Sequence, residues 1–214
     1  CDFQGSPPGL MLGSGDSCVG CVIRRSYFRS GGEGQSPGRA GWAAVEFRSA
    51  VVRDAVIEDC TIVANHPSFG EGVGISLGSN TEDVVIRRNL IMEAASSAVI
   101  LSRYSVTAPF PQNVTITTNS IFNSSWIAID HGYDNVTLND GVLDPSQPNS
   151  GMDYPVIEEA IWNGSYLFVS GYVNSEGAGS GSPEFAGSAI EVYLVNNSNG
   201  GDDLSGNELG GRYY

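Results

Sequence analysis

Six ionisable side chains have the types that acid–base chemistry on a sugar polymer requires. They are Asp54, Asp59, Asp83, Asp130, His131 and Asp134. A glycosidase needs two carboxyl groups at a fixed separation on one face, and a lyase needs carboxylate-bound calcium with an Arg or Lys base. All 10 basic residues are Arg, so Arg is the only such base and no Schiff base can form within the chain. These residues can act together only if the fold brings them into one groove.

The main element of the sequence is a repeated strand. In each copy, a short run with alternating apolar residues is followed by a polar residue. Four copies can be aligned on that polar residue: Val22–Phe28, Val56–Ile62, Val85–Ile91 and Thr115–Ile121. They recur at intervals of roughly 30 residues, a spacing typical of solenoids. A degenerate fifth copy, Thr137–Leu143, closes the series. Because Cys1–Phe3 matches only the tail of a copy, we expect the chain to begin inside a repeat of a longer protein.

A second short strand with alternating apolar residues follows each copy. These strands are Leu10–Leu12, Val45–Phe47, Ile75–Leu77, Val99–Leu101 and Ile127–Ile129. Two or more short strands per repeat, with no helical periodicity, predict an all-β coil of parallel strands whose turns stack about 4.8 Å apart.

The repeat resembles that of the right-handed parallel β-helix proteins of the pectate-lyase-like type, whose pattern is xVxIxxNxIxx followed by a short GIxL strand. The resemblance implies a β-helix over residues 1–145. It implies one inward column, made of Ile23, Ile57, Ile86, Ile116 and Leu138. It also implies an inward corner, made of Cys1, Ser26, Cys60, Asn89 and Asn119. Asn89 and Asn119 would then form an amide ladder that satisfies buried backbone groups at a bend.

Charged residues just before the corner form two rows across the turns. Arg24, Glu58 and Arg87 make one row, and the residues that follow them, Arg25, Asp59 and Arg88, make the next. The signs alternate, so correct stacking places each Arg beside a carboxylate and a slipped register opposes like charges. We interpret the rows as a device that fixes register.

The enzyme hypothesis has incomplete support in the motifs. Asp130-His131-Gly132 is similar to the His-bearing motif of the polygalacturonase relatives of this fold. The strand with paired Asp residues and the Arg-x-Lys motif that accompany it in those enzymes are missing. The sequence therefore favours a chain without catalytic residues.

The composition changes after Asp130, where Asp, Asn, Gly and Pro become frequent. This stretch is similar to a junction in large bacterial and archaeal surface proteins, where the last β-helix turn leads through an ND…D…N segment and NYPVI into an immunoglobulin-like sandwich. The resemblance implies a linker or cap at 146–155 and a partial immunoglobulin-like β-sandwich over 156–214. Four carboxylates in the region are candidate calcium ligands: Asp130, Asp134, Asp140 and Asp144. Capping of loops by Asx turns is the interpretation we favour, with calcium as the alternative.

The last segment contains strand patterns at Tyr166–Val173 and Ala189–Val195, separated by Gly- and Ser-rich turns. An immunoglobulin-like sandwich has about seven strands, and fewer are visible here. An unfinished sheet has free edges that pair with other strands, and Gly210–Tyr214 is suited to form one more strand.

Charge and cysteine content restrict the possible partners. The formal net charge of −14 makes nucleic acids and anionic membrane surfaces poor partners. No apolar run is long enough to insert into a membrane. Cys18 and Cys21 are spaced for a local disulfide or for two small core thiols rather than for zinc. Candidate N-glycosylation sites in N-x-[ST] motifs are Asn113, Asn123, Asn135, Asn163 and Asn196, which agrees with an extracellular or cell-surface location.

The longest loops, at 30–41, 65–72 and 103–112, are where a β-helix would place a binding surface. Aromatic residues on or beside them could stack on sugars or bury against a partner: Trp42, Phe69, Tyr104 and Phe110. Two function classes remain. We expect a structural constituent of a surface assembly, or an adhesin, whose partners are further copies or other surface proteins. The alternative is a carbohydrate-active enzyme or a carbohydrate-binding module with a polysaccharide partner.

Overall fold

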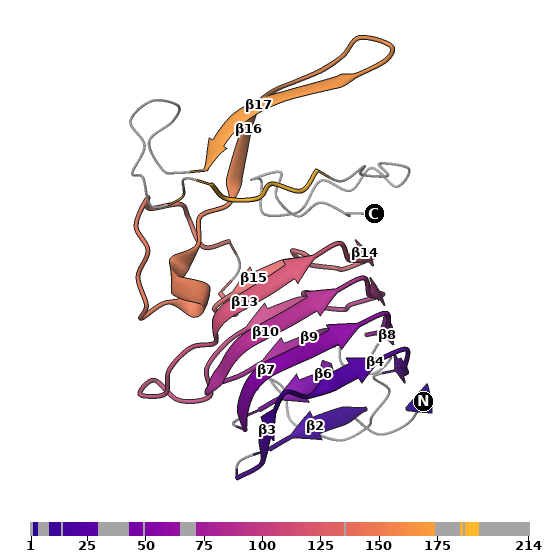
Figure 1. Cartoon of the computed structure of the whole chain (residues 1–214), viewed down its shortest axis with the longest axis vertical. Coiled ribbons are helices and arrows are strands. Elements are labelled where there is room, and N and C mark those ends of the chain that lie inside the picture. The colour runs from indigo at the N-terminus through magenta and orange to yellow at the C-terminus, as the bar shows by residue number, and fades with distance from the viewer. Residues whose placement is uncertain are drawn as a thin grey trace.

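The protein is an all-β parallel solenoid followed by a separate two-stranded antiparallel sheet (Figure 1). The structure, a computed structural model, describes residues 2–3, 9–13, 15–29, 43–48, 50–64, 72–134, 136–173, 185 and 187–192. The expected alternation of short strands and parallel turns is confirmed. In this described part of the chain, no helix is long and apolar enough to cross a membrane.

Each turn of the solenoid gives strands to three parallel sheets. The first sheet contains β1 (Asp2–Phe3), β5 (Tyr27–Arg29), β8 (Thr61–Val63), β11 (Leu90–Met92) and β14 (Ser120–Phe122). The second contains β3 (Ser17–Val19), β4 (Val22–Arg24), β7 (Val51–Glu58), β10 (Thr81–Arg87) and β13 (Gln112–Thr117). The third contains β2 (Leu10–Leu12), β6 (Ala43–Phe47), β9 (Val73–Leu77), β12 (Val99–Leu101) and β15 (Ile129–His131).

The predicted isoleucine column is confirmed in the second sheet, because Ile23, Ile57, Ile86 and Ile116 are directly paired in successive strands. Ile57 and Ile86 have no exposed surface, and complete burial of such a side chain contributes about 1.5–3 kcal/mol. Leu138 was wrongly assigned to this column. It lies outside any strand and is 69% exposed, because the chain has left the coil by that point.

The corner between the second and first sheets repeats one backbone conformation in every turn. Arg25, Asp59, Arg88 and Thr118 have φ values of 49°, 54°, 53° and 52°. This left-handed conformation turns the chain sharply, so the next residue points into the coil. The requirement for positive φ also explains why no apolar residue follows the strand at this point.

Residues 136–154 cap the last turn of the coil. The cap includes the short 3-10 element η1 (Pro148–Gly151). The Asn149 amide accepts from Val114 N–H at 2.8 Å and donates to Val114 C=O at 3.1 Å, and so occupies the free edge of β13 as a neighbouring strand would. Asn139 pairs in the same way with the backbone of Tyr154, at 2.9 Å for both hydrogen bonds. The linker or cap expected at 146–155 overlaps this segment.

Beyond the cap, β16 (Pro155–Trp162) and β17 (Leu167–Val173) form a hairpin that projects from the end of the coil opposite to β2, β3 and β4 (Figure 1). The strand predicted at Ala189–Val195 is not formed over residues 189–192, and residues 193–195 lie outside the described part. Instead of pairing with the hairpin, this segment contacts the coil through Glu191, whose carboxylate accepts the Thr118 N–H at 3.0 Å.

Candidate functional site

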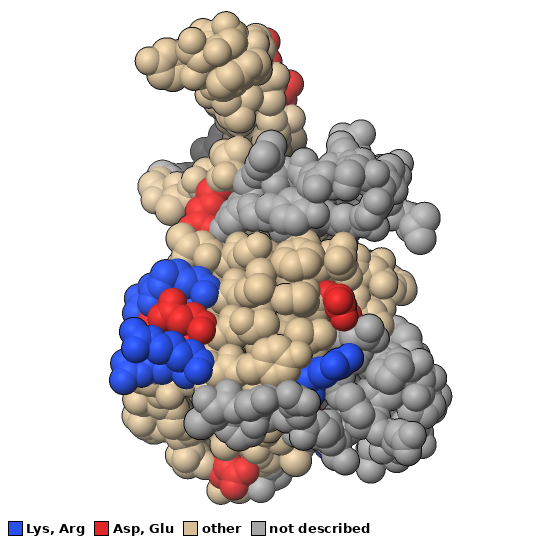
Figure 2. All heavy atoms as spheres, turned by 90° about the vertical axis from the view of Figure 1, so that its right-hand side faces the viewer, with Lys and Arg blue, Asp and Glu red and all other residues tan. Residues whose placement is uncertain are grey.

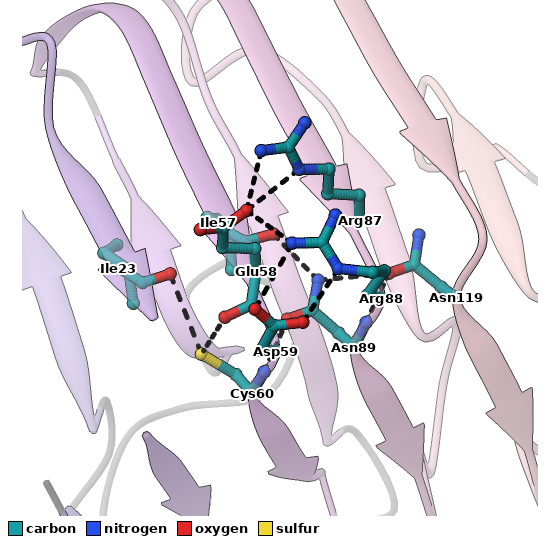
Figure 3. Close-up of polar contacts among 9 residues, drawn as sticks. All are labelled: Ile23, Ile57, Glu58, Asp59, Cys60, Arg87, Arg88, Asn89 and Asn119. Carbon is teal, nitrogen blue, oxygen red and sulfur yellow. Dashed lines mark hydrogen bonds and ion pairs between the residues drawn. The ribbon is translucent and has the colours of Figure 1, made fainter. Parts of the chain in front are cut away.

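The two predicted charge rows lie at the ends of β4, β7 and β10. Figure 3 shows four of their members, Glu58, Asp59, Arg87 and Arg88, and Figure 2 shows acidic side chains between basic ones on one side of the coil. Arg87 Nε donates to Glu58 Oε2 at 2.9 Å, and Arg88 Nη2 donates to the same oxygen at 2.8 Å. Arg88 Nε also donates to Asp59 Oδ1 at 2.9 Å. The predicted register is therefore confirmed, since every carboxylate of the row is bonded to an Arg of the next turn.

These bonds stabilise the charged form of both carboxylates. The hydrogen bond from Arg87 is the main cause that lowers the pKa of Glu58, and the hydrogen bond from Arg88 lowers the pKa of Asp59. A general acid needs a raised pKa, so neither group is prepared for that role. In the described residues, Arg24 and Arg25 form no ion pair and leave the row open at its first turn.

Behind the charge rows lies the predicted amide ladder (Figure 3). Asn89 Oδ1 accepts the Cys60 N–H at 3.0 Å, and Asn89 Nδ2 donates to Ile57 C=O at 2.9 Å and to Asn119 Oδ1 at 3.0 Å. Asn119 repeats the pattern one turn later, accepting the Asn89 N–H at 2.9 Å. Cys60 takes the same corner position in the preceding turn, where its thiol is buried. The ladder satisfies the backbone N–H groups of Cys60 and Asn89 at the bend.

Three of the candidate calcium ligands, Asp130, Asp140 and Asp144, accept hydrogen bonds within their own loops. Asp130 Oδ1 accepts the Tyr133 N–H at 3.0 Å, and Asp140 Oδ1 accepts the Val142 N–H at 3.0 Å. Asp144 accepts from Ser146, which lowers its pKa. Asp134 is exposed, and no group of three or more His, Cys, Asp or Glu among the described residues is arranged to bind a metal. The contacts of Asp140 and Asp144 with the residue two positions further on are Asx-type turns.

Asp54 and Asp83 lie at equivalent bends in β7 and β10, with φ values of 53° and 57°. Asn113 has the same conformation in β13, and its amide donates to the Asp83 carboxylate. His131 and Asp130 point to opposite sides of β15. His131 is paired with Leu101 of β12, whose side chain points into the coil. Its burial lowers its pKa to about 4. The residues proposed for acid–base chemistry are thus distributed over several faces.

The aromatic candidates that the structure describes do come together. Tyr104 and Phe110 line an open pocket of about 300 Å³ on the loop after β12, together with Arg103, Ser105, Val106 and Gly132. The Arg103 guanidinium lies 4.3 Å from the centre of the Phe110 ring. Trp42 and Phe69 lie outside the described residues.

A buried cluster that the sequence did not reveal lies beneath this pocket. Glu46 has no exposed surface, although it points outward from β6. Its Oε1 accepts from Tyr104 Oη at 2.6 Å and from Arg48 Nε at 2.8 Å. Burial and this carboxylate raise the pKa of Tyr104. The alternation Val45-Glu46-Phe47 predicts that Glu46 points outward. It does not indicate that Tyr104, from a distant loop, contacts the Glu46 carboxylate.

Three of the candidate glycosylation sites can be located. Asn113 and Asn123 are exposed at bends of the coil, with φ values of 54° and 57°. Asn163 lies in the turn between β16 and β17, where its Oδ1 accepts from Ser165 and Tyr166. Asn135 and Asn196 lie outside the described residues. Cys18 and Cys21 form a local disulfide, one of the two alternatives that their spacing left open.

No protein-family model matches the chain, and no solved structure matches it significantly.

Proposed function

We propose that this chain is a non-catalytic structural constituent of an extracellular surface assembly, such as a sheath, surface layer or filament, or of an adhesin. In this proposal the coil is a pectate-lyase-like right-handed β-helix and the hairpin begins an immunoglobulin-like sandwich, the arrangement that the sequence resembles in bacterial and archaeal surface proteins. Its partners are further copies or other surface proteins, and glycosylation of its candidate sequons belongs to the same proposal.

The observation that carries the proposal is how the carboxylates are used. Glu58 and Asp59 are bonded to arginines of the next turn, and Asp130 and Asp144 cap their own loops. A hydrolase needs two carboxyl groups facing one substrate, with one of them prepared as an acid. In the coil these four carboxylates instead fix the register between turns or cap loops. Both roles suit a stiff rod.

Two experiments test this function. Immunogold labelling of cells that make the protein should place it in a regular layer or fibre on the surface. Incubation of the purified chain with neutral and acidic polysaccharides should release no reducing ends or unsaturated products. Depolymerisation that is lost in Asp130→Asn or Asp134→Asn would establish the enzyme hypothesis and reject ours.

A carbohydrate-binding module is a second candidate, favoured by the pocket that combines the cation of Arg103 with the rings of Tyr104 and Phe110. Such a pair suits a sugar that carries a carboxylate. Calorimetric titration with an oligogalacturonate should show binding that both Arg103→Ala and Phe110→Ala reduce, whereas Ser165→Ala, at the hairpin turn, serves as the control. Equal heats from all three variants would reject this candidate.

A further inference from the structure

The turn between β16 and β17 contains an Asn-Gly pair, Asn163-Gly164, at the tip of the hairpin (Figure 1). Both residues are exposed, and so are Ser165 and Tyr166, which follow them. The turn lies beyond the last paired residues of the two strands, so its exposure does not depend on what pairs with their edges. An asparagine followed by glycine can react with its own backbone, because the next backbone nitrogen reaches the side-chain carbon through a five-membered ring.

The side-chain carbonyl of Asn163 is held by two hydrogen-bond donors. Its Oδ1 accepts the Ser165 N–H at 3.0 Å and the Tyr166 N–H at 2.9 Å. Two donors in these positions draw electron density from Cγ, and they are already in place for the negative charge that develops on Oδ1 when a nucleophile attacks Cγ. The turn therefore activates this carbonyl for nucleophilic attack.

The nucleophile is the backbone nitrogen of Gly164. No described residue accepts a hydrogen bond from the Gly164 N–H. Gly164 has a φ of 94°, and apart from its neighbours in the chain no heavy atom lies within 4 Å of the position that a Cβ would take. Because glycine has no side chain and rotates freely about its backbone bonds, its nitrogen can approach the Asn163 Cγ without hindrance.

Two other described asparagines lack this combination. The N–H that follows Asn113 belongs to Val114 and donates to Asn149 Oδ1 at 2.8 Å. The N–H that follows Asn149 belongs to Ser150 and donates to a backbone carbonyl at 3.2 Å. In both cases the nitrogen that would attack is already engaged, and a side chain on the following residue crowds it. Asn163 combines an activated carbonyl with a free backbone nitrogen.

We propose that Asn163 is a self-modifying site, at which the hairpin turn converts the side-chain amide into a carboxylate through a succinimide. The Gly164 nitrogen loses its proton to water or hydroxide and attacks Cγ of Asn163. The bond from Cγ to Nδ2 then breaks, and this nitrogen leaves as ammonia with a proton taken from water. Water adds to either carbonyl of the ring and gives aspartate or isoaspartate. In total, one amide and one water yield one carboxylate and one ammonium ion.

The two products differ in their effect on the hairpin. An aspartate at position 163 accepts the same two N–H groups through a charged oxygen, which strengthens both hydrogen bonds. An isoaspartate routes the backbone through the side chain and so lengthens the turn. Either product also removes the N-x-[ST] acceptor formed by Asn163-Gly164-Ser165. The conversion goes beyond the proposed surface role, and only the meaning of the lost acceptor rests on the glycosylation proposed above.

Timed incubation of the purified full chain in heavy-oxygen water at neutral pH tests the reaction. The chain is made in a host without N-glycosylation. Peptide mapping by mass spectrometry separates Asn163 from the second Asn-Gly pair, Asn199-Gly200, which lies outside the described residues. The peptide with Asn163 should exchange its amide for a carboxylate that carries heavy oxygen, whereas Asn113 and Asn149 should keep their amides. The rate should rise with pH, because the attacking nitrogen must lose its proton.

Three variants locate the cause of the conversion. Gly164→Ala should lose most of the product, because a Cβ hinders the attacking nitrogen and disfavours a positive φ. Asn163→Gln should form no product over the same period, because its ring would need one more atom. Ser165→Ala keeps its backbone N–H and should react at the wild-type rate.

The comparison with the unfolded chain decides whether the turn promotes the reaction. An Asn163 that keeps its amide while the urea-unfolded chain converts it would overturn the proposal, and so would an unchanged rate in Gly164→Ala. Neither result bears on the surface role, which immunogold labelling decides.

Discussion

Replacement of Asn89 by Ala tests whether the corner ladder stabilises the coil. The Asn89 amide is 2% exposed and bridges three neighbours: the Cys60 N–H, the Ile57 C=O and the Asn119 side chain. The substitution leaves the buried Cys60 N–H without this acceptor, which costs about 1–3 kcal/mol. Loss of the bond to Ile57 C=O adds about 1 kcal/mol. We therefore expect a destabilisation of about 2–4 kcal/mol.

Urea unfolding followed by circular dichroism measures this change, with a lowered midpoint and an unchanged slope. Ser165→Ala, at the exposed hairpin turn, should stay within about 0.5 kcal/mol of the wild type. Asn89→Asp keeps an acceptor for Cys60 but directs a second oxygen at Ile57 C=O, so it should be destabilising at pH 7 and recover as the carboxylate becomes protonated. An Asn89→Ala variant within about 0.5 kcal/mol of the wild type would refute the structural role of the ladder.

Three further predictions concern single side chains. The pKa of His131 is about 4 in the folded protein, below its unfolded value of about 6.5. The neutral ring therefore stabilises the fold fully only above pH 6.5, and the free energy of unfolding should fall by about 2 kcal/mol between pH 7.5 and 5. The difference between wild type and His131→Leu in urea midpoints over this range isolates that loss, and parallel pH profiles would reject it. Thr118 is β-branched with a φ of 52°, so Thr118→Gly should raise the thermal midpoint by the equivalent of about 0.5–1 kcal/mol, whereas Thr115→Gly, in regular strand, should lower it. Tyr104→Phe removes a donor from the buried Glu46 carboxylate and should cost about 1–3 kcal/mol in urea unfolding, a loss that should shrink in a Glu46→Leu background.

The coil could be predicted because its sequence repeats where its structure repeats. Ile57 and Ile86 mark the inward side of the strand, and Asn89 marks the corner, so one turn defines the next. The segment around Leu138 has the same apolar pattern as the earlier copies, but it does not add a strand to the coil. The edge of β13 that it would pair with is occupied by Asn149. The pattern at residues 189–192 is equally strand-like, but the Glu191 carboxylate binds the coil instead of aligning the segment with β17.

Prediction of the site was less complete, because side chains that are distant in sequence determine it. The charge rows were predictable since their members repeat at the period of the coil. The Glu46 cluster was not, because Tyr104 reaches it from a loop two turns further along the chain.

The buried Cys60 thiol gives this coil an internal reporter of fraying. Its side chain is held between Ile23 C=O and Glu58 C=O, and burial raises its pKa, so an alkylating reagent can react only when the first turns open. In a Cys1→Ser background, the labelling rate divided by the rate of an unfolded thiol would give the free energy of that opening. Comparison with global unfolding would show whether the coil unfolds as one unit or opens first at the turns around Cys60.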